Sequence, residues 1–282
     1  MTHRILGVLT AAFLIPGLAT AQQNATPSAQ LASAGSATSG SGVRRTSDGH
    51  PDLSGGWTYA IDIAPVALKK VTAGQVDRIT IDQSARHRPA DVPGALPWTK
   101  APSYKPELQA KVADLSAHQS KVDGVFYCGR PGVPRIGSPR KIIQLPGEII
   151  FLYEDISGNT FRTIPTDGRT HRPDADPSYY GDGVGRWQGD TLVVDTTNFV
   201  EDTWFGEEGY FHSDALHVIE RLWMVDGNLA YQVTVDDPTV LTQPWTNFAR
   251  VIKPSSVPLE ESPACKEDDG HRLQNLDHHL QR

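Results

Sequence analysis

Hydrophobic and polar residues alternate along the second half of the chain with the period of two that β-strands require. The clearest case is the turn Asp226-Gly227, flanked by the stretches VIERLWMV and NLAYQVTV. This dipeptide accepts positive φ at both central positions of a type I′ turn, and the two-residue loop fixes the register. The register places Glu220 opposite Val233, on the face that carries Tyr231. We therefore expect a carboxylate on the apolar face of a β-sheet.

A second hairpin is predicted at Gly189-Asp190, which joins VGRWQ to TLVVDTT. Its register turns Trp187 to the apolar face and leaves Arg186 and Asp195 as diagonal neighbours on the other face. Opposite charges at such positions are close enough to interact. We interpret this pair as structural, because ion pairs on a sheet surface are more often structural than catalytic.

The same alternation recurs in about eight short strands that follow one another from residue 141 onward, with little room for helices between them. Serial hairpins of this kind predict an all-β fold, an antiparallel meander closing into a lipocalin-like barrel able to hold one small ligand. A β-sandwich is the alternative architecture. Upstream, Gly55-Gly56-Trp57 fits the G-x-W pattern that opens lipocalin-like barrels, which implies that Trp57 is buried at the closed end near Arg250.

Before these strands, the pattern changes to the helical period over PELQAKVADLSAHQSK, residues 106–121. Leu108, Val112 and Leu115 share one face, and Pro106 suits a first helical turn. We expect a short helix lying against the sheet. The long segment before the helix, residues 60–103, is rich in proline and is predicted to be irregular.

The chain divides into three expected segments. Residues 1–21 have the features of a signal peptide, with Arg4, an apolar run and an A-x-A cleavage site. Residues 22–46 offer little to bury and predict a disordered tether, and residues 47–282 are expected to form a single β-barrel domain. The apolar run is too short to span a bilayer, so no membrane span is expected. The mature protein is therefore predicted to be periplasmic or secreted.

Charge and cysteine content narrow the possible partners. The formal net charge of −7 and the isoelectric point near 5.8 argue against nucleic acid, which requires a basic face. The chain has two cysteines, Cys128 and Cys265. Export to an oxidising compartment predicts a disulfide between them, with a nucleophilic cysteine as the alternative.

Three stretches resemble a group of secreted bacterial proteins that have no assigned chemistry: PDLSGGW, GVGRWQGDTLVVDTTNF and HSDALHVIERLWMVDGNLAYQVTVDDPTVLTQPWT. The resemblance covers nearly all of the chain after the tether and implies homology without a mechanism. Members tend to carry Cys-His-Glu near the C-terminus, where this chain has Cys265-Lys266-Glu267 and so lacks a histidine ligand. The expected meander is also similar to the lipocalin-like barrels of phenolic acid decarboxylases.

Five residues are candidates for catalysis: His171, His212, Asp214, His217 and Glu220. Imidazole and carboxylate together can form an acid–base group tuned by burial, or can ligate a divalent metal. A polar loop with solvated histidines is the third interpretation. The spacing matches no established metal motif, and strand alternation directs His217 and Glu220 to opposite faces if both lie in one strand. We therefore expect no cofactor, with a divalent metal as the alternative.

Six residues are candidates for substrate binding: Arg162, Tyr179, Arg186, Trp187, Trp204 and Tyr231. Arginine and tyrosine together offer a forked donor and a hydroxyl, which suit a carboxylate or phenolate. Aromatic side chains suit a flat apolar ligand. The alternative is that these residues only pack loops at the rim of the barrel.

The sequence contains no nucleophile elbow, phosphate loop, dinucleotide fingerprint or H-E-x-x-H motif. We expect an exported enzyme that uses cofactor-independent acid–base chemistry, such as decarboxylation, elimination or hydrolysis, on a small, partly aromatic substrate bearing a carboxylate or phenol. The alternative is a non-catalytic, lipocalin-like ligand-binding protein. The partner of Glu220 distinguishes them: a histidine allows proton transfer near neutral pH, whereas an arginine alone indicates a structural pair.

Overall fold

The computed structural model describes residues 43–58, 92–155, 157–262 and Cys265. The predicted signal peptide, most of the predicted tether and most of the proline-rich segment lie outside the described residues. All described residues fall in one compact unit.

The first sheet has four antiparallel strands in the order β1-β2-β3-β4. They are β1 (Gly55–Gly56), β2 (Lys141–Leu145), β3 (Glu148–Tyr153) and β4 (Thr160–Pro165). A tight turn at Pro146-Gly147, with φ of 76° at the glycine, joins β2 to β3. Alternate residues of β2, β3 and β4 are buried and form part of the core, among them Phe151 and Tyr153.

The second sheet has six antiparallel strands. They are β5 (Asp182–Gln188), β6 (Thr191–Thr197), β7 (His217–Val225), β8 (Asn228–Asp236), β9 (Trp245–Thr246) and β10 (Arg250–Ile252). β8 pairs with β7 on one side and with both β9 and β10 on the other. The C-terminal part of this sheet is therefore made of two short strands, β9 and β10.

Both predicted hairpin registers are confirmed. Trp187 pairs with Leu192 across the first turn, and Glu220 pairs with Val233 across the second. Asp226 and Gly227 have positive φ, as the two-residue turn requires. The antiparallel all-β prediction is thus correct.

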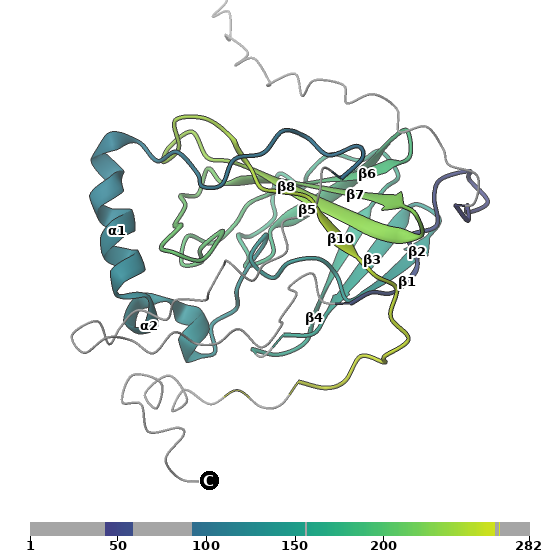
Figure 1. The fold of residues 1–282 in the computed structure, drawn as a ribbon, viewed down its shortest axis with the longest axis horizontal. Helices are drawn as coiled ribbons and strands as arrows, with labels where there is room; N and C mark the ends of the chain where they lie inside the picture. The colour runs from purple at the N-terminus through teal and green to yellow at the C-terminus, as the bar shows by residue number, and fades with distance from the viewer. Residues whose placement is uncertain (1–42, 59–91, 156, 263–264, 266–282) are drawn as a thin grey trace, which may run out of the picture. The chain divides into compact units, whose positions relative to one another are not determined.

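The predicted closed barrel is wrong, because the two sheets are not joined into one (Figure 1). On one side the described residues join the two sheets through an isolated bridge between Trp57 and Pro254 and through no longer ladder. On the other side β4 passes β5 without a ladder among the described residues. Gly185 allows this approach, since a Cβ there would lie 2.8 Å from Thr166 Cγ2. The connection 166–181 is too long for a hairpin that would close the barrel.

Trp57 is buried, as predicted, and its bridge partner Pro254 directly follows the last strand. Arg140 donates a hydrogen bond to the Trp57 carbonyl. The guanidinium of Arg250, the predicted neighbour, lies over the ring of Phe248. The burial of Trp57 is therefore confirmed, but its predicted place at the closed end of a barrel is wrong, because the sheets do not close.

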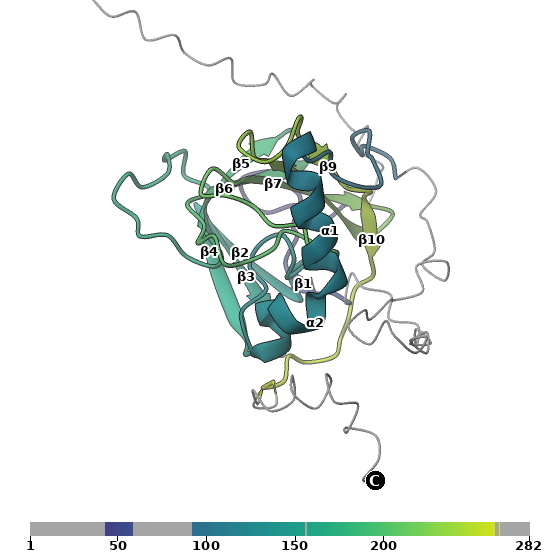
Figure 2. The ribbon, with the colours of Figure 1, turned by 90° about the vertical axis from the view of Figure 1, so that its left-hand side faces the viewer.

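The predicted helix forms as a series of short helical segments: η2 (Pro106–Leu108), α1 (Gln109–Ala117), α2 (Gln119–Val122) and η3 (Gly124–Tyr127). Leu108, Val112 and Leu115 are partly buried and pack against the core, as expected. Figure 2 shows α1 and α2 one below the other in front of the strands.

The predicted disulfide between Cys128 and Cys265 is confirmed, with an S–S distance of 2.05 Å. It ties the C-terminal tail to the end of η3. No helix in the described part of the chain is long and apolar enough to cross a membrane.

Candidate functional site

Glu220 lies inside the protein and forms an ion pair with an arginine. Its side chain is 0 % exposed, and Oε2 lies 2.7 Å from Nη1 of Arg162 in β4. The hydroxyl of Tyr231 donates to Oε1 at 2.9 Å. Among the described residues no histidine contacts this carboxylate. The prediction that Glu220 points inward is correct, and its partner is an arginine.

Arg162 is held on all sides in this interior cluster. It donates to Thr196 Oγ1 at 2.9 Å and to the Tyr153 hydroxyl at 3.1 Å. Burial disfavours its charge and is the largest single influence, but the Glu220 carboxylate and the Tyr153 hydroxyl together outweigh burial and raise the pKa of Arg162. Arg162 and Tyr231 are therefore suited to a carboxylate, as predicted, but the carboxylate they bind is that of Glu220.

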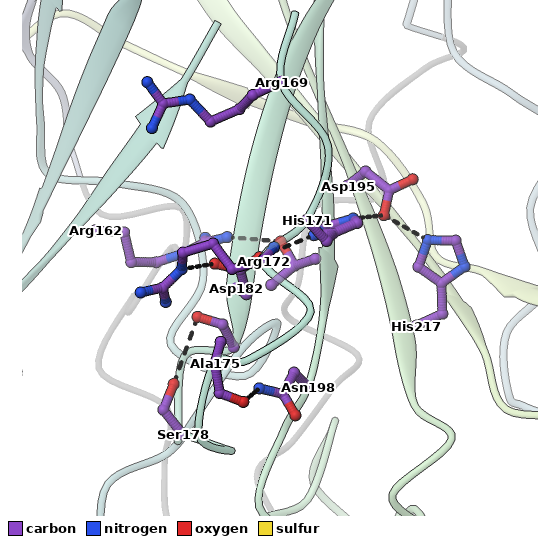
Figure 3. Close-up of polar contacts among 12 residues, drawn as sticks. Arg162, Arg169, His171, Arg172, Ala175, Ser178, Asp182, Asp195, Asn198 and His217 are labelled. Atoms are coloured by element: carbon purple, nitrogen blue, oxygen red, sulfur yellow. Dashed lines mark hydrogen bonds and ion pairs between the residues drawn. The ribbon is translucent and has the colours of Figure 1, made fainter.

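A second cluster lies on the opposite face of the same strands, where two histidines share one carboxylate. Nε2 of His217 lies 2.7 Å from Oδ1 of Asp195, and Nε2 of His171 lies 3.0 Å from the same oxygen. Nδ1 of His171 lies 3.2 Å from Oδ2 of Asp182. Figure 3 shows His171 between the two carboxylates and His217 beyond Asp195.

Strand geometry explains why these groups meet. Asp182, Asp195 and His217 belong to the neighbouring strands β5, β6 and β7. Asp195 pairs with Ile219, so Asp195 and His217 are diagonal neighbours on one face. His217 and Glu220 are three residues apart in β7, and strand alternation sends them to opposite faces. This outcome was expected if the strand includes His217.

The loop between β4 and β5 contributes the rest of the cluster. It carries His171 and the adjacent Arg172, whose backbone N–H and Nε both donate to Asp182 at 2.9 Å. The carboxylate of Asp182 therefore receives three hydrogen bonds or ion contacts from this loop. These contacts fix the loop over the sheet.

The electrostatics of the cluster favour charged forms. The hydrogen bond to Asp195 raises the pKa of His217, although partial burial opposes this. Burial alone would raise the pKa of Asp195, but the two imidazoles outweigh it and lower that pKa. Burial likewise opposes ionisation of Asp182, and Arg172 and His171 lower its pKa.

The geometry also selects a tautomer of His217. A carboxylate only accepts hydrogen bonds, so Nε2 of His217 carries the proton that faces Asp195. Nδ1 makes no hydrogen bond to any described residue and points away from Asp195 (Figure 3). The side chains of His217 and Asp195 are 33 % and 39 % exposed. A ring nitrogen free to exchange a proton, on an imidazole oriented by a carboxylate, is the arrangement of a general acid or base.

Two predicted catalytic residues are not part of this cluster. Nε2 of His212 lies 2.8 Å from Thr203 Oγ1, and its Nδ1 lies 2.8 Å from the Ser213 carbonyl oxygen. Burial lowers the pKa of His212, which favours the neutral ring. Asp214 is exposed on the turn before β7. These two residues are not brought together with His171 and His217.

The remaining substrate-binding candidates are dispersed over the described part of the chain. The Tyr179 hydroxyl lies 3.4 Å from Asp202, and Trp204 is buried beneath the guanidinium of Arg135. Trp187 stacks on His50, with ring centroids 4.6 Å apart. These aromatic residues do not line a common site with the interior cluster.

The predicted ion pair between Arg186 and Asp195 is wrong. Arg186 donates instead to the carbonyl oxygens of Gly168 and Arg169, at 3.5 and 3.2 Å. Asp195 is occupied by the two histidines. Asp195, Asp182 and Arg172 were therefore not predicted as site residues, although Asp195 was predicted to lie beside Arg186. Strand alternation in TLVVDTT could have identified Asp195, because it places this carboxylate on the outward face of the strand.

No group of three or more His, Cys, Asp or Glu side chains in the described residues is arranged to hold a metal ion. The histidine and carboxylate side chains of the outer cluster contact one another directly.

Comparison with known proteins adds little. No family model and no curated protein matches the chain. One similar solved structure is described as a REP1-NXSQ fatty acid transporter, with 11 % sequence identity and a TM-score of 0.27. The match covers 42 % of this chain and 70 % of that one. A similarity this low supports no argument about function.

Proposed function

We propose that this chain is an exported enzyme that transfers protons on a small molecule, with His217 as the acid–base group. The observation that carries the proposal is that His171 and His217 share one oxygen of Asp195 on an accessible face of the sheet. Nδ1 of His217 has no hydrogen-bond partner in the described residues, so it is the atom that accepts or donates the proton.

The neighbouring residues take supporting roles. Asp195 orients the His217 ring and stabilises its protonated form, as a carboxylate does in catalytic triads. His171 holds Asp195 from the other side and is itself held by Asp182. Arg172 uses Nε for Asp182, and its Nη groups have no partner among the described residues. These groups are suited to a carboxylate or phenolate of the substrate.

An imidazole that can exchange a proton supports reactions in which a proton is moved to or from the substrate. Decarboxylation, elimination and hydrolysis each need a proton to be moved at a defined atom, and a histidine near neutral pH supplies this. The signal peptide expected from the sequence and the disulfide between Cys128 and Cys265 support a periplasmic or secreted location. The resemblance to a group of secreted bacterial proteins supports the same location, and one of the motifs that carry it contains Asp195.

Two families of probe test the proposal: 4-hydroxycinnamic acids for decarboxylation and 4-nitrophenyl esters for hydrolysis. We expect turnover of at least one family, reduced at least about 100-fold by His217→Gln. His118→Gln is the matched control, because His118 also contacts an aspartate, Asp114, but lies on the exposed surface of the helical segment. Undiminished turnover in folded His217→Gln protein, or no turnover of either probe family by the wild type, contradicts the proposal.

A non-catalytic ligand-binding protein is the second candidate. It is favoured by the interior cluster, where Glu220 is paired with Arg162 and Tyr231 and no described histidine contacts it. Calorimetric titration with a 4-hydroxycinnamate distinguishes the two. Saturable binding with no turnover supports the binding protein, whereas turnover that depends on His217 rules it out.

A further inference from the structure

The first sheet has apolar side chains on both faces. Ile149, Phe151 and Tyr153 of β3 point into the core, and the alternate residues Ile150 and Leu152 point outward. Antiparallel sheets normally present polar side chains on the face that meets water, so this strand has the pattern of one covered on both sides.

The outward side chains form one continuous surface, which we term the outer patch. The ladder places Leu152 beside Phe161, and Ile143 beside Ile150. The outer patch consists of five residues from β2, β3 and β4: Ile143, Leu145, Ile150, Leu152 and Phe161. Phe161 is 66 % exposed and Leu145 is 45 % exposed. An exposed apolar surface of this kind marks an interaction site.

The patch carries one positive and one negative side chain at opposite ends. Lys141 lies in the row of Leu152 and Phe161, and Glu148 lies in the row of Leu145. Four residues along a strand and one strand across separate them by about 14 Å, too far for an ion pair within one molecule. Neither side chain forms a salt bridge with another described residue. Glu148 attracts the guanidinium of Arg169 electrostatically but forms no direct ion pair with it, so both carry a charge that a partner can meet.

We propose that the outer patch binds the outer patch of a second copy of this chain. In a two-fold interface each residue meets its counterpart reciprocally, so Lys141 of one copy meets Glu148 of the other, and the pair occurs twice. The apolar side chains between these pairs are then buried. A patch with one charge of each sign, on a chain of formal charge −7, is poorly suited to an anionic membrane surface.

The size of the patch sets the strength of this dimer. Three strands spaced about 4.8 Å apart and six residues long give a face of about 300 Å². A standard stable interface covers about 800 Å² on each partner. The dimer is therefore weak, with a dissociation constant in the micromolar range or above, and it forms only at high protein concentration.

Sedimentation velocity over a range from about 1 to 500 µM tests this weak association. We expect a monomer–dimer equilibrium whose dissociation constant rises at least tenfold with Phe161→Thr or Leu145→Thr. Val257→Thr is the matched control, since Val257 is also an exposed apolar residue but lies outside the patch. Thermal unfolding of each variant checks that the monomer remains folded. We expect unchanged unfolding temperatures, because these side chains are exposed.

Charge reversal tests the reciprocal pairing separately. Lys141→Glu alone and Glu148→Lys alone each place like charges opposite one another and weaken the dimer. The double variant restores the pairs and should return the dissociation constant to within about threefold of the wild-type value. A chain that stays monomeric at 500 µM overturns the proposal. Association that the Phe161 and Leu145 variants leave unchanged, or capture by phosphatidylcholine vesicles in place of dimerisation, also overturns it.

Discussion

The two faces of strands β6 and β7 hold ionic groups in opposite circumstances. On the inner face, Glu220 and Thr196 meet Arg162, and all three side chains are buried. Asp195, which precedes Thr196 in the chain, lies on the outer face. There it contacts His217, and about a third of each side chain is exposed. The same two strands therefore support a closed cluster and an open one.

The difference shows how burial separates structure from chemistry. The inner ion pair has strong partners, but a substrate cannot approach it without opening the core. The outer pair has the same 2.7 Å separation but is partly exposed, so solvent screens it and its imidazole can exchange protons with a molecule in solution. The sequence pattern singles out Glu220 as a carboxylate on an apolar face, but its burial beside Arg162 makes it a structural group.

The largest expected effect breaks the inner pair. Arg162→Met leaves Glu220 buried without a countercharge and should lower the free energy of unfolding by about 3–5 kcal/mol. Urea denaturation followed by fluorescence measures this change. Arg169→Met is the matched control: Arg169 pairs with Asp167 at the exposed surface, and its loss should cost less than about 1 kcal/mol. Equal effects of the two substitutions contradict the assignment of the inner cluster.

The next effect distinguishes the two faces by activity. Asp195→Asn removes the charge that orients His217 and should reduce the turnover of a responsive probe by about 100-fold. Glu220→Gln should leave turnover per folded molecule within about twofold, because Glu220 has a structural role. The comparison uses initial rates normalised to the folded fraction. A loss with Glu220→Gln that equals the loss with Asp195→Asn contradicts the division of roles.

The inner face was largely predictable from sequence. Two-residue turns at Gly189-Asp190 and Asp226-Gly227 fix their hairpin registers, so the inward direction of Glu220 followed directly. The alternation of side chains along a strand also predicted that His217 and Glu220 lie on opposite faces of the sheet. The partner of Glu220 did not follow, because Arg162 belongs to the other sheet.

The outer face was less predictable because long connections set its geometry. Residues 198–216 join β6 to β7, and a loop of this length does not fix which residue of one strand faces which residue of the next. The meeting of Asp195 with His217 depends on that register. The same limit applies to connection 166–181, which brings His171 to Asp195 and prevents β4 and β5 from forming the hairpin that a closed barrel needed.

A smaller effect concerns stability and pH. The folded-state pKa of His217 is raised above 6.5, so its contribution to stability is complete below pH 6.5 and is lost as pH rises through the folded-state value. The pKa of Asp195 is lowered from 3.8, so its contribution is complete above that pH and is lost in stronger acid. The stabilisation from this partly exposed pair should stay below about 1 kcal/mol.

Urea denaturation of wild type and His217→Gln between pH 4 and pH 9 measures this contribution. The difference in unfolding free energy should be largest between about pH 5 and pH 6 and should shrink above neutrality. His212 titrates in the opposite sense because burial lowers its pKa, but it is present in both proteins and cancels. A difference that grows with rising pH contradicts the assigned pairing.

The most direct test of the acid–base site is an NMR titration of the imidazole nitrogens in ¹⁵N-histidine-labelled protein. His217 should titrate with a pKa above 6.5, should carry its proton on Nε2 in the neutral form, and should lose this elevation in Asp195→Asn. A neutral His217 protonated on Nδ1, or a pKa that Asp195→Asn leaves unchanged, would show that Asp195 does not prepare His217 for proton transfer.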